Sequence, residues 1–212
     1  MVAIDQSPKE QGLRFGVLGE AWVHLCIDMQ RMFADETEWH TPWMDRVLPD
    51  VVRVVELDPP KTVFTRFIPP NSAEQLGGSW RRYYERWASM TRDRMDPALL
   101  DLVPDLARFV PPASLKDKLV MSPWFGGLHR RLRDTGVETI VTGAATEVCV
   151  LAAMMGGMDL GYRMILVTDA ICSSADGTHD AMLGIYQSRY GMQVETTTTT
   201  ELIAARLDGF IR

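Results

Sequence analysis

The sequence predicts an α/β fold with a central parallel sheet. Short runs in which successive residues are apolar alternate along the chain with longer segments whose apolar residues recur at helical spacing. Strands that are buried on both faces and separated by helices are typical of βαβ units. A chain of 212 residues with 46% hydrophobic composition can bury one sizeable core, so we expect a single domain over residues 1–212.

The first strand candidate is AWVHLCI at residues 21–27, which places Asp28 at the carboxyl end of a buried strand. Later strand candidates are residues 62–67, 118–121, 137–142, 162–168 and, with a weaker pattern, 193–196. Helical patterns occupy residues 43–57, 127–134, 147–160, 179–190 and 201–207. Folds of this kind bind ligands beyond the carboxyl ends of their strands, where the loops of different strands converge.

One connection, residues 69–112, is about twice the usual length and contains a helix of its own. Its apolar residues follow the i, i+3, i+4, i+7 spacing of a single helical face: Trp80, Tyr83, Tyr84 and Trp87. Three interpretations stay open for this helix, namely packing on the core, a lid over a site, or a subunit contact. Because so much aromatic surface is seldom left in water, we expect a homo-oligomer, either a dimer or a tetramer.

Charge and hydropathy argue against several classes of partner. The net charge of -6, without a basic stripe, argues against a nucleic-acid partner. No apolar run approaches the roughly 20 residues of a membrane span, and the first 16 residues lack the pattern of a secretory signal. We therefore expect a cytoplasmic protein that acts on a small molecule.

The cysteines and histidines do not form the spacings of a disulfide framework or a metal site. Cys26, Cys149 and Cys172 are odd in number and far apart, which favours reduced thiols. The four histidines are scattered, and no two of them have the HxxxH or HxH spacing that brings two nitrogens to one metal. We expect neither a metal nor a cofactor.

Cys149 lies in the most informative stretch, VETIVTGAATEVCV at residues 137–150, which is typical of a buried strand, a turn of small residues and the start of a helix. In the first turn of a helix, free N–H groups and the helix dipole favour a thiolate, so we expect a pKa below the free value of about 8.5. The same N–H groups are suited to an oxyanion formed when sulfur attacks a carbonyl. The alternative is a cysteine that packs as a small apolar side chain.

Asp28 and Lys118 are each ambiguous when taken alone. An aspartate after a strand often caps the next turn, and a lysine in the run KDK at residues 116–118 is usually a solvated charge. The three residues gain weight together, because Asp28, Lys118 and Cys149 occur in order near three strand ends of one α/β pattern.

Four motifs resemble those of the isochorismatase-like cysteine hydrolases: LCIDMQRMF at 25–33, KLVMSPW at 118–124, TGAATEVCVLAA at 142–153 and GYRMILVTDA at 161–170. The resemblance covers residues 21–207 and implies a three-layer α/β/α sandwich that often forms dimers or tetramers. It also implies that Asp28, Lys118 and Cys149 are the catalytic residues.

The cysteine motif departs from the family pattern at two positions. Ala144 replaces a larger residue, and Glu147 replaces a shorter Asn or Asp and so adds a charged arm near the helix start. The resemblance also implies a cis peptide bond between Ala144 and Ala145. The N–H groups of Ala145 and Cys149 would then form the oxyanion hole.

The resemblance implies a hydrolase that cleaves a C–N bond in a small amide, carbamoyl compound or ureide through a thioester on Cys149. Nicotinamidases of the family commonly carry an Asp-x-His metal motif after the second strand, but residues 65–70 read TRFIPP here. A metal-dependent nicotinamidase is thus disfavoured. The alternative from another class is a binding or assembly protein that keeps the fold without turnover.

Substrate contacts are expected from side chains that follow the strand ends, namely Phe33, Arg66, Met121 and Trp124, together with Glu147. These residues would form an apolar pocket with one cation, in which Arg66 grips a substrate carboxylate. The alternative for Arg66 is a position facing solvent or another subunit, and the alternative for Trp124 is a place in the core.

Overall fold

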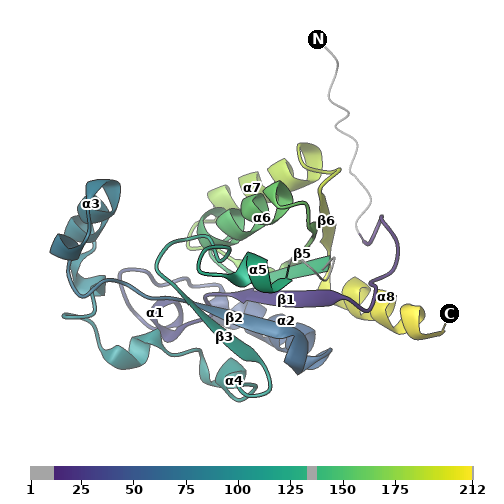
Figure 1. Ribbon diagram of the computed structural model, residues 1–212, viewed down its shortest axis with the longest axis horizontal. Coiled ribbons are helices and arrows are strands. Elements are labelled where there is room, and N and C mark those ends of the chain that lie inside the picture. The colour runs from purple at the N-terminus through teal and green to yellow at the C-terminus, as the bar shows by residue number, and fades with distance from the viewer. Residues whose placement is uncertain (1–11, 133–137, 212) are drawn as a thin grey trace, which may run out of the picture.

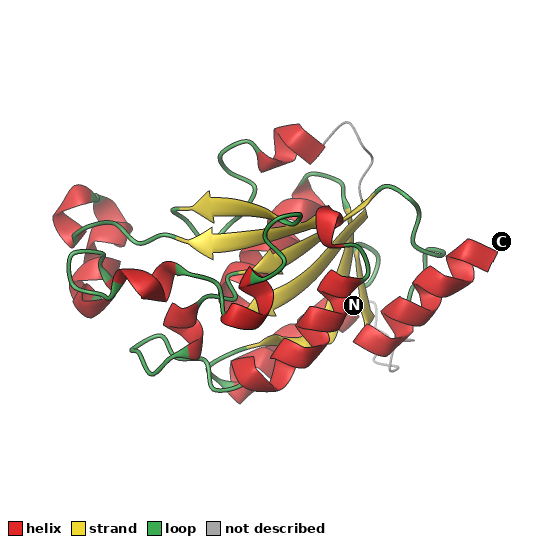
Figure 2. Cartoon of the chain, turned by 90° about the horizontal axis from the view of Figure 1, so that it is seen from below, coloured by secondary structure: helices red, strands yellow, loops and turns green. Residues whose placement is uncertain are grey.

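The computed structural model describes residues 12–132 and 138–211, and its centre is a six-stranded parallel sheet (Figures 1 and 2). The strands are β1 (Trp22–Ile27), β2 (Thr62–Phe67), β3 (Ser114–Lys118), β4 (Glu138–Ala144), β5 (Arg163–Cys172) and β6 (Val194–Thr197). Their order across the sheet is β3-β2-β1-β4-β5-β6, and every neighbouring pair is parallel. The predicted α/β fold is confirmed. The direction in which successive strands are added to the sheet reverses between β1 and β4.

Helices cover both faces of this sheet and complete a three-layer sandwich. They are α1 (Arg31–Ala34), α2 (Met44–Glu56), α3 (Gly78–Arg86), α4 (Pro104–Ala107), α5 (Leu128–Leu132), α6 (Leu151–Asp159), α7 (Asp176–Ser188) and α8 (Thr199–Ile211). One apolar core lies under α2 and α8, and a second lies under α5, α6 and α7. Among the helices that the structure describes, none has the length and apolar character needed to cross a membrane.

Strand β1 shows why the buried strands were recognisable in the sequence. Trp22 and Cys26 point into the core under α2, whereas Val23, Leu25 and Ile27 point into the core under α6. Alternate side chains of a strand face opposite sides of the sheet, so a strand covered by helices on both sides is apolar throughout.

The edge strand β3 lies earlier than the sequence predicted. The apolar run at 118–121 was expected to be the strand, but the strand ends at Lys118 and residues 119–121 form a bend. Leu119 is 72% exposed, so this apolar run is not core. Because β3 has only one neighbour in the sheet, it tolerates the polar residues Lys116 and Asp117.

The predicted helices all occur, with ends shifted by one to a few residues. The helix expected at 147–160 begins with a π-helical turn, Thr146–Val150, that continues into α6. The last helix, α8, is longer than the expected 201–207. Residues 133–134 of one expected helix, residue 137 of one expected strand and residues 1–11 lie outside the described part of the chain.

Gly143 allows the ends of β1 and β4 to approach closely. Its φ of +108° is in the left-handed region, and a Cβ added there would overlap the backbone of Ile27. Ile27 and Gly143 are register partners in the sheet. The residue after Ile27, Asp28, is therefore held next to the turn that leads from β4 into the π-helical turn.

Buried His24 gives the first prediction. It is 0% exposed, its two ring nitrogens bond to the hydroxyls of Thr62 and Thr142, and burial lowers its pKa from 6.5 to about 3. Below pH 6.5 the unfolded chain binds a proton at His24, whereas His24 in the folded chain stays neutral. Because proton binding stabilises the unfolded chain, the free energy of unfolding falls as the pH falls. We expect His24 to reduce the free energy of unfolding by up to about 1.4 kcal/mol per pH unit between pH 6.5 and 3.

Urea denaturation at pH 7, 6 and 5 checks this expectation. The His24→Gln variant should lose the His24 part of the pH dependence, while His40→Gln, at a half-buried position, should keep it. Equal pH dependence in the wild type and His24→Gln would contradict the prediction.

Candidate functional site

Three buried polar side chains meet at the carboxyl edge of the sheet. Asp28 follows β1, Lys118 ends β3 and Cys149 lies in the π-helical turn after β4. The Lys118 ammonium nitrogen lies 2.7 Å from Asp28 Oδ2 and 3.4 Å from Cys149 Sγ. Their exposed fractions are 0% for Asp28, 4% for Lys118 and 6% for Cys149. The three residues singled out at strand ends thus stand in mutual reach.

Asp28 is held by the neighbouring strand. The Thr65 hydroxyl on β2 donates to Asp28 Oδ1 at 2.6 Å and accepts from the Asp28 N–H at 3.1 Å. The backbone of Asp28 has a φ of +49°, a left-handed conformation that aspartate tolerates better than most residues. These bonds fix one carboxylate oxygen on Thr65 and leave Oδ2 facing the Lys118 ammonium.

Lys118 stays charged despite its burial. Burial alone lowers its pKa, but the charges and hydrogen bonds of Asp28 and Cys149 outweigh that effect and raise the pKa above its ordinary 10.5. The ammonium also donates to the Val120 carbonyl at 3.2 Å and lies 5.0 Å from the centre of the Phe67 ring. A cation over an aromatic face is a further stabilising contact.

The surroundings of Cys149 favour the neutral thiol. Burial raises its pKa, the nearby Asp28 carboxylate raises it further, and the Lys118 ammonium opposes both effects. The expectation of a lowered pKa at a helix start is therefore wrong, because the loss of solvation outweighs the helix dipole. A thiol in this state needs a base to take its proton before it can attack a carbonyl.

The turn that carries Cys149 has an unusual backbone. The peptide bond between Ala144 and Ala145 is cis. Val148 N–H and Val150 N–H both donate to the Ala145 carbonyl, at 3.0 and 3.1 Å, so this oxygen is occupied on the helix side. Cys149 lies between these two donors and faces the cavity.

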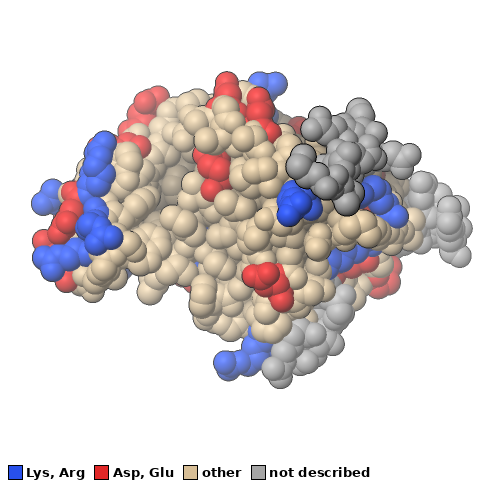
Figure 3. Space-filling model, turned by 90° about the horizontal axis from the view of Figure 1, so that it is seen from above, with Lys and Arg blue, Asp and Glu red and all other residues tan. Residues whose placement is uncertain are grey.

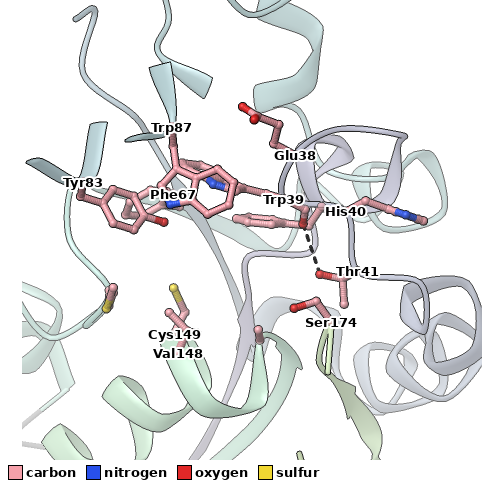
Figure 4. Close-up of a pocket in the computed structure, with 13 residues that line it drawn as sticks. Glu38, Trp39, His40, Thr41, Phe67, Tyr83, Trp87, Val148, Cys149 and Ser174 are labelled. Atoms are coloured by element: carbon pink, nitrogen blue, oxygen red, sulfur yellow. Dashed lines mark hydrogen bonds between the residues drawn. The ribbon is translucent and has the colours of Figure 1, made fainter. Parts of the chain in front are cut away.

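A cavity of about 360 Å³ opens above Cys149 (Figure 4). Its floor consists of Met121, Ala145, Val148 and Cys149. We call the opposite wall the aromatic roof, which consists of Phe33, Trp39, Phe67, Tyr83 and Trp87. Figure 4 shows the Cys149 sulfur pointing from the floor toward these rings. The remaining lining residues are Glu38, His40, Thr41 and Ser174.

The aromatic helix predicted at 80–87 is α3, and its rings pack within the chain. Tyr84 is 1% exposed and lies in one cluster with Phe67 and Trp80, while Tyr83 contacts Trp39 with ring centres 6.0 Å apart. Tyr83 itself, with Trp87 just beyond the helix, completes the roof. Trp80, Tyr83 and Trp87 stay half-buried, so the homo-oligomer remains a prediction. The rings that line the cavity make the helix part of the cavity wall.

Of the five expected substrate contacts, the structure brings Phe33 and Met121 to the cavity. Arg66 instead forms two hydrogen bonds to Asp117, at 2.8 and 2.9 Å, because the two residues are register partners on β2 and β3. The carboxylate clamp assigned to Arg66 therefore loses its basis.

Trp124 and Glu147 also lie away from the cavity lining. The Trp124 ring stacks on Tyr162 and its N–H donates to the Ala153 carbonyl at 2.8 Å, which places it in the core under α6. Glu147 accepts a hydrogen bond from Ser173 at 2.7 Å. Both side chains contact residues that lie far away in the sequence, so the sequence near each of them does not show these contacts.

The sequence reasoning missed the segment at 38–41, which supplies Glu38, Trp39, His40 and Thr41 to the cavity. This stretch has no regular periodicity, so no pattern marked it. In the described ranges, 12–132 and 138–211, no group of three His, Cys, Asp or Glu side chains is placed to hold a metal ion.

The isochorismatase domain model matches residues 23–201. The chain belongs to the isochorismatase family of hydrolases. The uncharacterized isochorismatase family protein YwoC of Bacillus subtilis (strain 168) is 34% identical to it over 107 residues, which are 47% of this chain and 55% of that protein. The chain thus matches about half the length of this relative.

Solved structures share the fold of this chain. A cysteine hydrolase from Pseudomonas syringae pv. phaseolicola 1448A superposes with a TM-score of 0.79 at 18% identity, over 94% of this chain and 99% of that one. An N-carbamoylsarcosine amidase from Thermoplasma acidophilum superposes with a TM-score of 0.66 at 17% identity, over 84% and 96%. At these identities the likeness is one of fold.

The second prediction tests the coupling of Asp28 and Lys118. We expect Lys118→Met to lower the free energy of unfolding by about 3–5 kcal/mol, because the variant leaves the Asp28 carboxylate buried without its partner. The double variant Asp28→Asn/Lys118→Met should recover much of this loss, since neither side chain is then charged.

Urea denaturation of the wild type, Asp28→Asn, Lys118→Met and the double variant measures the coupling energy between the two side chains. Lys116→Met, two residues earlier on the same edge strand, is the matched control and should cost far less. Additive losses in the double variant would show that the two side chains do not stabilise each other.

Proposed function

We propose that this protein hydrolyses a C–N bond in a small amide, carbamoyl compound or ureide, with Cys149 as the nucleophile. The observation that supports this most directly is the position of the Lys118 ammonium, 2.7 Å from the Asp28 carboxylate and 3.4 Å from the Cys149 thiol. Cys149, in turn, lies on the floor of the cavity. A nucleophile, a base and an orienting charge in one water-poor place are the parts that acyl transfer requires.

In the first half of the reaction, Asp28 takes the proton of Cys149 as the sulfur attacks the substrate carbonyl carbon. The N–H groups of Ala145 and Cys149 stabilise the oxyanion of the tetrahedral intermediate. Lys118 balances the negative charge on the sulfur and the carboxylate. The C–N bond then breaks, the leaving nitrogen takes the proton from Asp28, and a thioester on Cys149 remains.

In the second half, water replaces the departed amine. Asp28 removes a proton from this water, whose oxygen attacks the thioester carbonyl. When the second tetrahedral intermediate collapses, the C–S bond breaks and Cys149 recovers its proton from Asp28. One carboxylate therefore acts twice as a base and twice as an acid, and the net change is the addition of one water across the C–N bond.

The third prediction concerns the nucleophile. Cys149→Ala should abolish hydrolysis in a panel of small amides, carbamoyl compounds and ureides, scored by release of ammonia and amine. Cys26→Ala is the matched control, since Cys26 is also a buried cysteine but packs in the core under α2 and does not line the cavity. This control should keep its activity.

Rapid acid quench during turnover, followed by mass spectrometry, should show an acyl adduct on the Cys149 peptide of the wild type. Full turnover by Cys149→Ala would exclude the thioester route. Specific binding of panel compounds without any hydrolysis by the wild type would favour a binding protein on this fold.

The fourth prediction concerns pH. The alkaline limb of the activity should lie above pH 10.5, because the pKa of Lys118 is raised above that value and the ammonium keeps its proton until then. Asp28→Asn should lose most of the rate, because an amide cannot take the proton of Cys149. Measurement of kcat/KM from pH 4 to 11 tests the position of the alkaline limb. An alkaline midpoint near pH 8 would contradict the assigned role of Lys118.

A further inference from the structure

The aromatic roof is a continuous π surface above the nucleophile. Its rings come from separate parts of the chain, and Trp39 links them, with ring centres 6.0 Å from those of Phe33, Phe67 and Tyr83. Phe33 and Trp39 are nearly parallel, with an interplanar angle of 13°. Surfaces of this kind bind two classes of group well: flat neutral rings, and organic cations attracted to the negative ring faces.

The charges around the cavity distinguish between these two classes. Glu38 lines the cavity, and no Lys or Arg does so among the residues that the structure describes. Two cations on neighbouring strands are paired with carboxylates, Lys118 with Asp28 and Arg66 with Asp117. The cavity therefore presents aromatic faces and one acid, a combination that favours a positive ligand over a neutral or negative one.

The Glu38 carboxylate is held by a hydrogen bond within the chain. The Ser89 hydroxyl donates to one oxygen of the Glu38 carboxylate, which joins the segment around Glu38 to the insertion that carries α3. Arg81, Arg82 and Arg86 of α3 are exposed, and none of them lines the cavity. The Arg86 guanidinium lies 4.4 Å from the centre of the Trp87 ring, so this ring of the roof already contacts a cation. Lys and Arg side chains gather at the end of the molecule that carries α3 (Figure 3).

We propose that the substrate is an organic cation: an amide, carbamoyl compound or ureide whose carbonyl lies over Cys149 and whose ammonium group lies against the aromatic roof, toward Glu38. The cavity of about 360 Å³ suits a small molecule of this class. This inference rests on the proposed function, since it names the substrate class for the same site.

Binding to the Cys149→Ala variant tests the proposal without turnover. Three acetamides serve as probes because they share the acetamido group and differ in one terminal group: N-(2-trimethylammonioethyl)acetamide, its uncharged isostere N-(3,3-dimethylbutyl)acetamide, and N-acetyl-β-alanine. Calorimetry should show the ammonium probe binding at least tenfold more tightly than the isostere, with the carboxylate probe weakest. Equal or tighter binding of the isostere would overturn the proposal and indicate a pocket for neutral apolar groups.

Two further substitutions in the same background test the named contacts. Trp39→Leu should remove most of the preference for the ammonium probe over its isostere, and Glu38→Gln should weaken the ammonium probe about fivefold while sparing the isostere. Glu85→Gln, an exposed acid on α3, is the matched control and should change neither. Equal losses for both probes in the Glu38 and Trp39 variants would overturn the proposal.

The proposed hydrolase function and the proposed cationic substrate can each be rejected without rejecting the other. A preference for the ammonium probe in Cys149→Ala, combined with no hydrolysis of any panel compound by the wild type, would leave the cation site and reject the hydrolase. Hydrolysis by the wild type without such a preference would keep the hydrolase and reject the cationic substrate.

Discussion

The buried ion pair between Asp28 and Lys118 is the constraint on which the rest of the site depends. Removing two charges from water costs several kcal/mol for each ion, and only close geometry with further hydrogen bonds offsets that cost. Here β2 lies between the two strands that carry the pair. It contributes the Thr65 hydroxyl to the carboxylate and the Phe67 ring to the ammonium. Three adjacent strands must therefore end in register for the pair to exist.

The same pair affects the state of the thiol. Burial raises the pKa of Cys149, the carboxylate raises it further, and the ammonium lowers it, so the pair adjusts a shift that burial dominates. A permanently charged thiolate in this buried place would be costly. In the reaction that we propose, proton transfer at the moment of attack avoids that cost, because the negative charge leaves the carboxylate as it develops on the sulfur.

The sequence was informative wherever burial is uniform along a segment, and uninformative where contacts join distant segments. Strand β1 was recognisable because both of its faces are covered, whereas β3 was misplaced because an edge strand tolerates polar residues. Cys149 was found from its strand, turn and helix pattern. The direction of its pKa shift was wrong, because burial depends on tertiary packing. Arg66 was misassigned because its partner, Asp117, follows from strand register, which one sequence does not display.

Phe67 is the one residue that belongs both to the aromatic roof and to the surroundings of the ion pair, since the Lys118 ammonium lies over its ring. The other roof positions, such as Trp39 and Trp87, belong to segments that carry no member of the pair. In the function that we propose, recognition and chemistry would thus be encoded in largely separate stretches of the chain. Such a division lets the range of accepted molecules drift during evolution by single changes in the roof, while position 67 is restrained by both demands at once.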